Sequence, residues 1–178
     1  LFDGYWEDIG TISSFHAANL DLTATLPKFN LFDTEAPIYT HARYLPPSKV
    51  NHCQINQSIV SEGCILTRAV INRSLIGVRT RIDFGATIDD TYVMGADYYQ
   101  SIEEMAADVR AGTPRIGIGE GTVIRKALID KNARIGAGVR LVNERGVQEE
   151  TAPDESYFIR EGIILVPKNA VIKDGTVV

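Results

Sequence analysis

Two adjacent acids near the start of the chain are the first candidates for a functional site. The stretch GYWEDIGT places Glu7 and Asp8 directly after Trp6, the only tryptophan, and ends in a Gly-Thr turn. Carboxylate oxygens are ligands that Mg²⁺ prefers, so Asp8 could hold a metal ion. An Asp at this position could equally cap a helix that begins near Ile12. The residues alone leave both interpretations open.

A run of basic residues in the last third of the chain is a second candidate. Between Arg115 and Arg145 there are seven Lys and Arg residues against three acids, in a chain of net charge −5. A small phosphorylated anion would suit such a local excess of positive charge. The alternative is that most of these side chains simply point into solvent from an exposed face, which is the usual place for such charges.

Apolar residues that recur every six positions indicate the fold that must position these groups. Six is neither a helix period nor a strand alternation. It is the repeat of a parallel β-helix, in which six residues form one flat side and three sides form a coil of about eighteen. About five coils are expected. The recurring residues are Ile59, Ile65, Ile71, Ile76, Ile82, Ile88 and Met94, then Ile118, Ile124, Ile129, Ile135 and Leu141, and finally Val166, Ile172 and Val178.

The residues between these apolar positions support a β-helix. Gly and Asn recur where a coil must turn, and both tolerate positive φ at low cost. Small residues such as Ser58, Ala86 and Ala133 can fill a narrow interior. A sandwich of short antiparallel strands is the alternative, but its spacing is seldom fixed at six. The predicted corner residues are Gly63, Gly77, Gly85, Gly119, Gly121, Gly136, Gly138, Gly175, Asn56, Asn72 and Asn132.

The segment before the repeats predicts one helix and a linker. Residues 11–26 favour a helix that begins at Thr11 or Ser13, because both residue types cap helices well. Residues 27–49 contain several prolines, including the string YLPPSK, which favours an extended linker. The helix residues expected to face inward are Ile12, Phe15, Leu22 and Leu26.

Two insertions interrupt the repeats. Residues 95–115 carry a helical pattern after Ser101, with Ile102, Met105 and Val109 on one face. Residues 143 to about 160 are rich in acids, and their polarity favours a solvent-exposed loop.

The histidines and cysteines are poor candidates for a site. Hexapeptide proteins include acyltransferases with a His as general base, and carbonic anhydrases that bind Zn²⁺ through three His. Here His16, His41 and His52 fall in the predicted helix, the linker and the first coil, so no coil spacing brings them together. Cys53 and Cys64 are not one whole coil apart, so we expect two separate thiols in the core.

The overall composition limits the class of partner. The net charge of −5 argues against general nucleic-acid binding. The sequence shows no signal peptide and no apolar run of about 18 residues. We therefore expect a cytoplasmic protein whose partners are small molecules or other protein subunits, with no nucleic acid and no membrane. Terminal coils need capping or a partner, so oligomerisation is expected.

Several strings of the sequence together resemble one family from end to end of the chain. They are similar to the C-terminal part of bacterial and plant ADP-glucose pyrophosphorylase, also called glucose-1-phosphate adenylyltransferase. Generic hexapeptide proteins do not share strings as specific as PIYTHARYLPPSK and LIDKNARIG. The strings are GYWEDIGT, APIYTHARYLPPSKV, MGADYY, IGIGEGTVIRKALIDKNARIG and VQEE with YFIREGIILVPKNAVIKDGTVV.

The resemblance implies a fold and a division of the chain. It implies a left-handed parallel β-helix, preceded by one helix and an extended linker from the end of a nucleotidyltransferase domain. The usual crossover rule would give the opposite hand, so the hand comes from the resemblance alone. Residues 1–26 are then the tail of the catalytic domain, 27–49 the linker, and 50–178 the regulatory and oligomerisation domain of a dimer or homotetramer.

The resemblance also implies a role for the two acids. In similar sugar nucleotidyltransferases, an acid in a W-x-D-x-G-T turn helps to hold the Mg²⁺ that bridges the phosphates of substrate and product, and Asp8 matches it. Glu7 is the candidate for a contact with the sugar hydroxyl groups. One carboxylate combined with phosphate oxygens is a usual way to hold Mg²⁺.

A second implied site binds phosphorylated effectors. In the family they occupy a crevice between the catalytic domain and the β-helix, and the matching residues are Lys131 and Lys168, with Arg43 and His41 from the linker. Lysines supply point charges and arginine a planar fork, which together can hold a phosphate or carboxylate. His41 departs from many plant members, which have Gln, so the identity of the effector is left open. Taken alone, both lysines could be ordinary outward-facing coil residues.

The implied parent enzyme joins ATP and glucose 1-phosphate to give ADP-glucose and pyrophosphate for glycogen or starch synthesis. The family's Gly-rich nucleotide loop and its catalytic Arg and Lys lie upstream of the matching region, and GIGEG falls in a coil corner rather than between a strand and a helix. We therefore expect a fragment, inactive alone, from the cytoplasm or from a plastid if the source is a plant. The alternatives are a free-standing hexapeptide acyltransferase and a non-catalytic scaffold related to the family.

Overall fold

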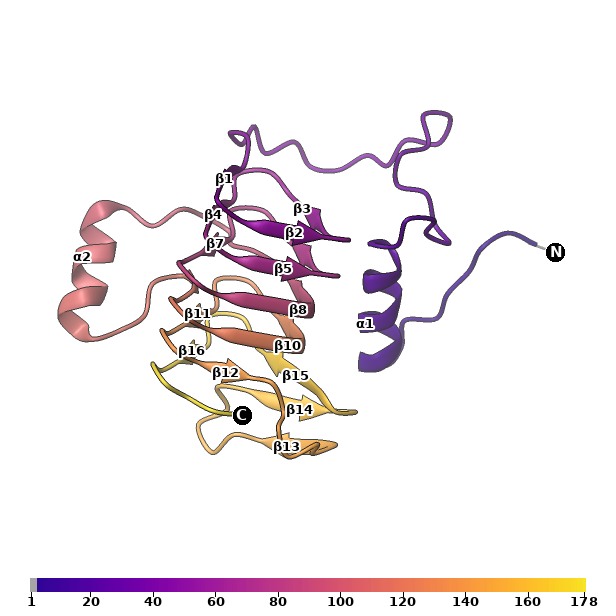
Figure 1. Ribbon diagram of the computed structural model, residues 1–178. Helices are drawn as coiled ribbons and strands as arrows, with labels where there is room; N and C mark the ends of the chain where they lie inside the picture. Colours follow the sequence, from indigo (N-terminus) through magenta and orange to yellow (C-terminus); the bar gives the residue numbers. More distant parts are fainter. Residues whose placement is uncertain (1–2) are drawn as a thin grey trace.

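The computed structural model describes residues 3–178 and shows a stack of three-sided coils with parallel strands on each side (Figure 1). The first face contains β1 (Lys49–Asn51), β4 (Ile65–Thr67), β7 (Arg81–Ile82), β9 (Gly117–Ile118), β11 (Arg134–Ile135) and β16 (Val171–Ile172). The second contains β2 (Gln54–Asn56), β5 (Val70–Asn72), β12 (Arg140–Leu141) and the first halves of β8 (Thr87–Val93) and β10 (Val123–Ile129). The third contains β3 (Ile59–Val60), β6 (Leu75–Ile76), β15 (Ile163–Val166) and the second halves of β8 and β10. The predicted parallel β-helix is confirmed.

The coils are shorter than the expected eighteen residues. Lys49 pairs with Ile65, and Val70 pairs with Thr87, so one coil takes 16 or 17 residues. Some sides therefore use five residues rather than six, and the inward-facing positions shift along the chain. Leu66 is completely buried and the predicted Ile65 only partly.

The same shift makes two further predictions of buried core residues wrong. Val93 rather than Met94 is buried at the end of β8, and Ile59 in the first coil is only partly buried. The other predicted positions are confirmed as buried, and their side chains form one continuous core. They are Ile71, Ile76, Ile82, Ile88, Ile118, Ile124, Ile129, Ile135, Leu141, Val166, Ile172 and Val178.

The corners use fewer glycines and asparagines than expected. Asn132 has the expected positive φ of 61°, but after Asn56 and Asn72 it is the following residue, Gln57 or Arg73, that adopts positive φ. β8 and β10 turn from the second face to the third through left-handed residues, Asp90 and Lys126. Long polar side chains at such corners can extend into solvent, so only the backbone conformation carries a cost. The predicted glycines with positive φ are Gly63, Gly85, Gly121, Gly138 and Gly175.

Gly119 is needed for close approach between coils, not for a left-handed conformation. A Cβ atom there would lie 2.5 Å from the carbonyl carbon of Gly136 in the next coil. Gly121 has a φ of +65° and open space around its Cα. The two glycines therefore predict different responses to the same substitution.

We expect Gly119→Asn to lower the free energy of unfolding by about 1–3 kcal/mol, because the side chain forces two coils apart. Gly121→Asn is expected to cost only a few tenths of a kcal/mol, because Asn tolerates the left-handed region. Urea unfolding followed by circular dichroism compares the two variants. Equal losses would show that the contact between coils does not constrain Gly119.

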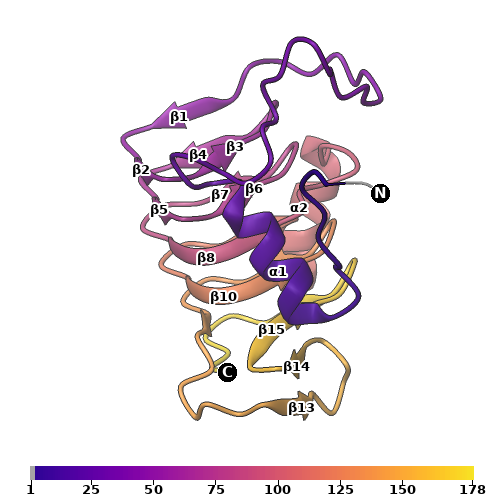
Figure 2. The ribbon, with the colours of Figure 1, turned by 90° about the vertical axis from the view of Figure 1, so that its right-hand side faces the viewer.

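The N-terminal helix packs across the outside of the coils. Helix α1 spans Ile12–Asp21, and its N-cap is Thr11, whose side chain and backbone exchange hydrogen bonds with Ser14. Figure 2 shows α1 lying over the strands β8 and β10. The Phe15 ring stacks on Tyr92 of β8, with 6.2 Å between ring centroids. The predicted start at Thr11 is confirmed.

The predicted end and inward face of α1 are partly wrong. The helix ends at Asp21 with Leu22 as its C-cap, and the Leu26 side chain is 91% exposed. His16 and Leu20 are buried instead, and the His16 ring Nε2 lies 2.7 Å from the Asp90 carbonyl oxygen. Burial lowers the pKa of His16, which favours the neutral ring.

The first insertion forms the predicted helix, which projects from the stack (Figure 1). Helix α2 spans Ile102–Ala111, with a capping box between Ser101 and Glu104. Its apolar residues Ile102 and Val109 are 82% and 75% exposed, so the described chain does not cover them. An ion pair of 2.6 Å between Asp108 and Arg134 attaches the helix to the coils.

The second insertion is a hairpin, so the prediction of a loop is wrong. Strands β13 (Glu149–Thr151) and β14 (Phe158–Arg160) pair antiparallel, and β14 continues the sheet beside β15. The Ile159 side chain is completely buried in the core, while the acids Glu149, Asp154 and Glu155 are exposed. The apolar strand β14 is therefore enough to extend the sheet beyond β15, although the segment around it is polar. Residues 27–48 contain neither helix nor strand, as expected of a linker.

Candidate effector site

Coil stacking brings the two predicted effector lysines to one corner. Ile129 of β10 pairs with Val166 of β15, and Lys131 and Lys168 each follow two residues later. The stacked strands therefore place both side chains at the same corner of neighbouring coils, between the third face and the first. Register, rather than sequence proximity, creates this pair.

Both lysines contact the carboxylate of Asp97. The Lys131 Nζ atom lies 3.2 Å from Asp97 Oδ1, and the Lys168 Nζ atom lies 2.7 Å from Asp97 Oδ2. Asp97 follows β8, whose Val93 pairs with Ile129, so it occupies the same corner one coil earlier. Three successive coils thus each contribute one charged side chain.

Two asparagines hold this corner in shape. The Asn132 side chain accepts a hydrogen bond from the Asp97 backbone N–H at 2.8 Å and donates to Asp97 Oδ2 at 3.1 Å. It also lies 3.1 Å from Asn169 Oδ1, to which it donates. Asn132 and Asn169 both have positive φ, which Asn tolerates. We call Asp97, Lys131, Asn132, Lys168 and Asn169 the lysine corner.

The charges of the lysine corner are accessible to a dissolved anion. The side chains of Lys131, Lys168 and Asp97 are 39%, 49% and 37% exposed. Hydrogen bonds from Lys168 and Lys131 hold the pKa of Asp97 well below its usual range, and Asp97 in turn raises the pKa of Lys168. Asp97 and Lys168 are therefore both charged at neutral pH. Two ammonium groups that converge on one carboxylate can also converge on a phosphate group.

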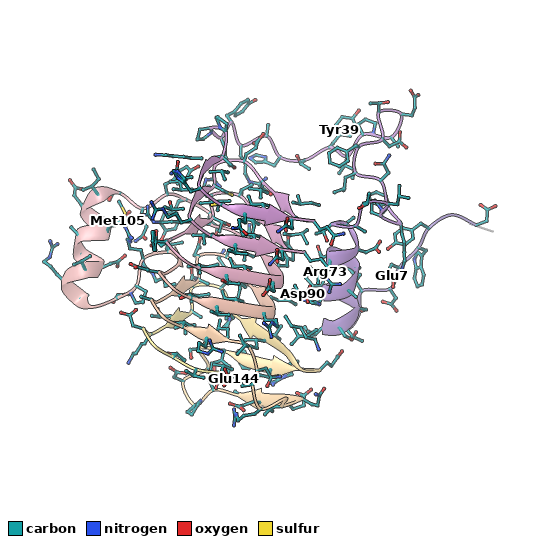
Figure 3. All side chains as sticks on the ribbon, viewed as in Figure 1. Glu7, Tyr39, Arg73, Asp90, Met105 and Glu144 are labelled. Carbon is teal, nitrogen blue, oxygen red and sulfur yellow. The ribbon has the colours of Figure 1, made fainter. Side chains whose placement is uncertain are left out.

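The linker residues predicted for this site lie apart from it. The Arg43 Nη1 atom donates to the His41 carbonyl oxygen at 3.3 Å, and both side chains are exposed. Among residues 3–178, no hydrogen bond or ion pair joins either of them to the lysine corner. Figure 3 shows Tyr39, in the same linker, extended away from the coils.

The two N-terminal acids are also exposed and separate from the lysine corner. Asp8 Oδ1 accepts a hydrogen bond from the Gly10 backbone N–H at 2.9 Å, so Asp8 closes a local turn and is not the helix cap. Figure 3 places Glu7 beyond α1, on the side opposite Met105 of α2. Within the described range 3–178, no three metal-binding side chains cluster.

Most of the basic run is paired with acids, which favours the solvated-surface interpretation. Arg115 pairs with Asp83 at 3.0 Å, and Arg140 with Glu144 at 2.7 Å. Arg145 also pairs with an acid, Glu150. The run therefore forms no single anion-binding patch, and the lysine corner is a more specific candidate than the run as a whole.

The histidines and cysteines lie apart, as their spacing predicts. His16 is in α1, His41 in the linker and His52 in the turn after β1. Cys53 and Cys64 are free thiols, one partly and one fully buried. None of the helices in the described part of the chain is both long and apolar enough to cross a membrane.

Sequence comparison supplies an independent finding about the coils. Residues 43–177 match the family model described as the GLGC left-handed parallel beta-helix domain. The matched region contains every strand of the stack, helix α2 and the whole lysine corner.

Proposed function

The chain belongs to the family of the GLGC left-handed parallel β-helix domain, the C-terminal domain of ADP-glucose pyrophosphorylase, and from this premise we propose that it is the regulatory and assembly part of such an enzyme. The complete enzyme would join ATP and glucose 1-phosphate to form ADP-glucose and pyrophosphate. Residues 1–26 would belong to its catalytic domain, 27–49 to the linker, and 50–178 to the regulatory domain.

The meeting of Lys131 and Lys168 is the observation that carries the regulatory part of this proposal. Their distances of 3.2 and 2.7 Å from one carboxylate mean that both ammonium groups reach a single anionic group. A phosphorylated effector would take the same two groups. Arg43 and His41 would approach the effector from the linker side, because both side chains are exposed.

The elements that carry the lysine corner also hold helix α1. Strand β8 leads to Asp97, and its Tyr92 stacks on Phe15 of α1. Glu161, which precedes β15, accepts a hydrogen bond from the Ser13 backbone N–H at 3.2 Å. Occupation of the corner would therefore act on α1 and, through it, on the turn that contains Asp8. We propose this contact chain as the route from the effector to the catalytic side.

Asp8 and Glu7 would contribute to catalysis in the complete enzyme. Mg²⁺ bound between substrate phosphates and a carboxylate stabilises the negative charge that builds up during nucleotidyl transfer. Asp8 would hold the ion through its exposed carboxylate, and Glu7 would orient the sugar through its hydroxyl groups. The nucleotide itself would be bound by residues other than those of this chain.

Uncovered apolar surface supports the proposal of a dimer or homotetramer. Ile102 and Val109 on α2 and Val50 on the first coil are all exposed. Another subunit or the catalytic domain would cover them, and Val50 lies on the terminal coil, which needs a cap. Light scattering at tens of micromolar is expected to give a dimer or tetramer, and a clean monomer would contradict the assembly role.

The enzymatic proposal is tested on the full-length gene product. We expect it to form ADP-glucose from ATP and glucose 1-phosphate in the presence of Mg²⁺, and to respond to phosphorylated effectors. The 178-residue chain alone is the matched control and is expected to form none. Coenzyme A binding by the chain, with no ADP-glucose formed by the full-length protein, would favour an acyltransferase instead.

A further inference from the structure

Asp97 has a second role at the lysine corner: we propose that its carboxylate occupies the anion position, so that only a doubly charged phosphate group, and not a carboxylate, displaces it. This role rests on the proposed effector function of Lys131 and Lys168. It adds the class of ligand that the corner selects and the residue that selects it.

The lysine corner is already satisfied without a ligand. Each oxygen of Asp97 takes one ammonium group, at 3.2 Å from Lys131 and 2.7 Å from Lys168. The Asn132 amide completes the set through a hydrogen bond of 3.1 Å to Asp97 Oδ2. A carboxylate held between two ammonium groups and one amide is arranged as a bound anionic ligand would be.

The backbone holds this internal anion in place. The Asp97 N–H donates to Asn132 Oδ1 at 2.8 Å, and the neighbouring Ala96 N–H donates to the Val78 carbonyl oxygen at 2.9 Å. Two residues later, the Tyr99 hydroxyl donates to the Gly63 carbonyl oxygen at 2.8 Å. Because the segment is anchored on both sides of Asp97, a dissolved anion must compete with a tethered carboxylate, whose effective concentration is high.

The carboxylate can nevertheless leave by side-chain rotation. The Asp97 side chain is 37% exposed, so it can turn into solvent. The inserted segment that carries α2 does not depend on the Asp97 carboxylate for its position, because the ion pair between Asp108 and Arg134 anchors α2 separately. Displacement of Asp97 therefore does not require α2 to unfold.

The balance of charge decides which ligand can displace Asp97. A carboxylate ligand brings the same single negative charge as Asp97 and lacks its tether, so it gains nothing by exchange. A phosphate monoester carries between about −1.5 and −2 charges at pH 7 and offers three acceptor oxygens. It can bond both lysines and the Asn132 amide at once. Asp130, whose Oδ1 accepts from the Lys131 backbone N–H at 2.6 Å, lies beside the corner and opposes the binding of any anion, so the ligand must bond both lysines to bind.

The test compares Asp97→Asn with the unchanged chain in calorimetric titrations with inorganic phosphate and with acetate at about pH 7.5, where phosphate is mostly doubly charged. Asn keeps the shape of the side chain but removes the competing charge. We expect the variant to bind phosphate roughly threefold to tenfold more tightly. Acetate binding is expected only in the variant. Asp97→Ala, which removes both side-chain oxygens, is expected to show the same gains in phosphate and acetate affinity as Asp97→Asn.

Asp174→Asn is the matched control, because Asp174 lies at a different corner and its Oδ1 accepts from the Ala137 N–H at 2.9 Å, a bond that Asn retains. It makes the same change in net charge and is expected to leave phosphate affinity unchanged. If Asp97→Asn binds phosphate no more tightly than Asp174→Asn, or if the unchanged chain binds acetate as well as phosphate, the proposal for Asp97 is overturned.

Two further outcomes separate the role of Asp97 from the effector role itself. Phosphate binding that is lost in Lys131→Ala but unaltered in Asp97→Asn would leave the effector site standing and overturn only the role of Asp97. Absence of phosphate binding in every variant, including Asp97→Asn, would overturn both.

Discussion

Replacing Lys131 and Lys168 together by alanine in the complete enzyme is expected to raise the activator concentration for half-maximal effect by about tenfold or more. Each lysine supplies a charged hydrogen bond to the effector, which is stronger than a neutral one. Partial exposure of both side chains weakens these bonds through solvent screening and limits the expected loss. Turnover without activator is expected to fall far less. Initial rates of ADP-glucose formation over a range of activator concentrations measure both quantities.

Lys173→Ala is the control for this prediction. Lys173 is exposed and lies on the last coil, outside the lysine corner. The substitution removes one surface charge and is expected to leave activation unaltered. If the double variant responds to activator like the parent enzyme, the effector site lies elsewhere and the two lysines are ordinary surface residues.

Asp8→Asn in the complete enzyme is expected to lower turnover by about a hundredfold or more, with an altered dependence on Mg²⁺, because the change removes a charged metal ligand and keeps its shape. Folding stability is expected to change little, because Asp8 is exposed and Asn can still accept the hydrogen bond from the Gly10 N–H. The measurements are kcat against Mg²⁺ concentration and the melting temperature.

Asp33→Asn is a matched control for Asp8, because Asp33 forms the same kind of local turn. Its Oδ1 accepts from the Glu35 backbone N–H at 2.9 Å, in the exposed linker. This variant is expected to keep both activity and stability. Normal turnover with unaltered Mg²⁺ dependence in Asp8→Asn would remove Asp8 from the metal site.

The repeat made the architecture predictable because each coil buries one apolar residue per side. Ile124 and Ile135 are examples, since both are fully enclosed by neighbouring coils. The coil length was not predictable, because a side of five residues and a side of six bury the same apolar group. Leu66 replaces Ile65 for that reason. The hairpin was missed because β14 is only three residues long and contributes one fully buried residue, Ile159, in a segment rich in acids.

The site was predictable only in part. The family resemblance identified Lys131 and Lys168, but Asp97 was missed, because an insertion separates it from them in sequence. The pairing of Val93 with Ile129 and of Ile129 with Val166 places all three at one corner, and a correct count of coil length would have revealed it. Arg43 and His41 lie in a linker with no repeating pattern, so no periodicity could position them.

Whether Lys131 and Lys168 form one anion site can be measured by following the side-chain amino groups of the lysines by NMR during a titration with inorganic phosphate. The signals of Lys131 and Lys168 are expected to shift together with one midpoint, because both contact the same anion, while the Lys173 signal stays constant. Midpoints that differ between Lys131 and Lys168, or shifts no larger than that of Lys173, would show that the two lysines do not share a ligand.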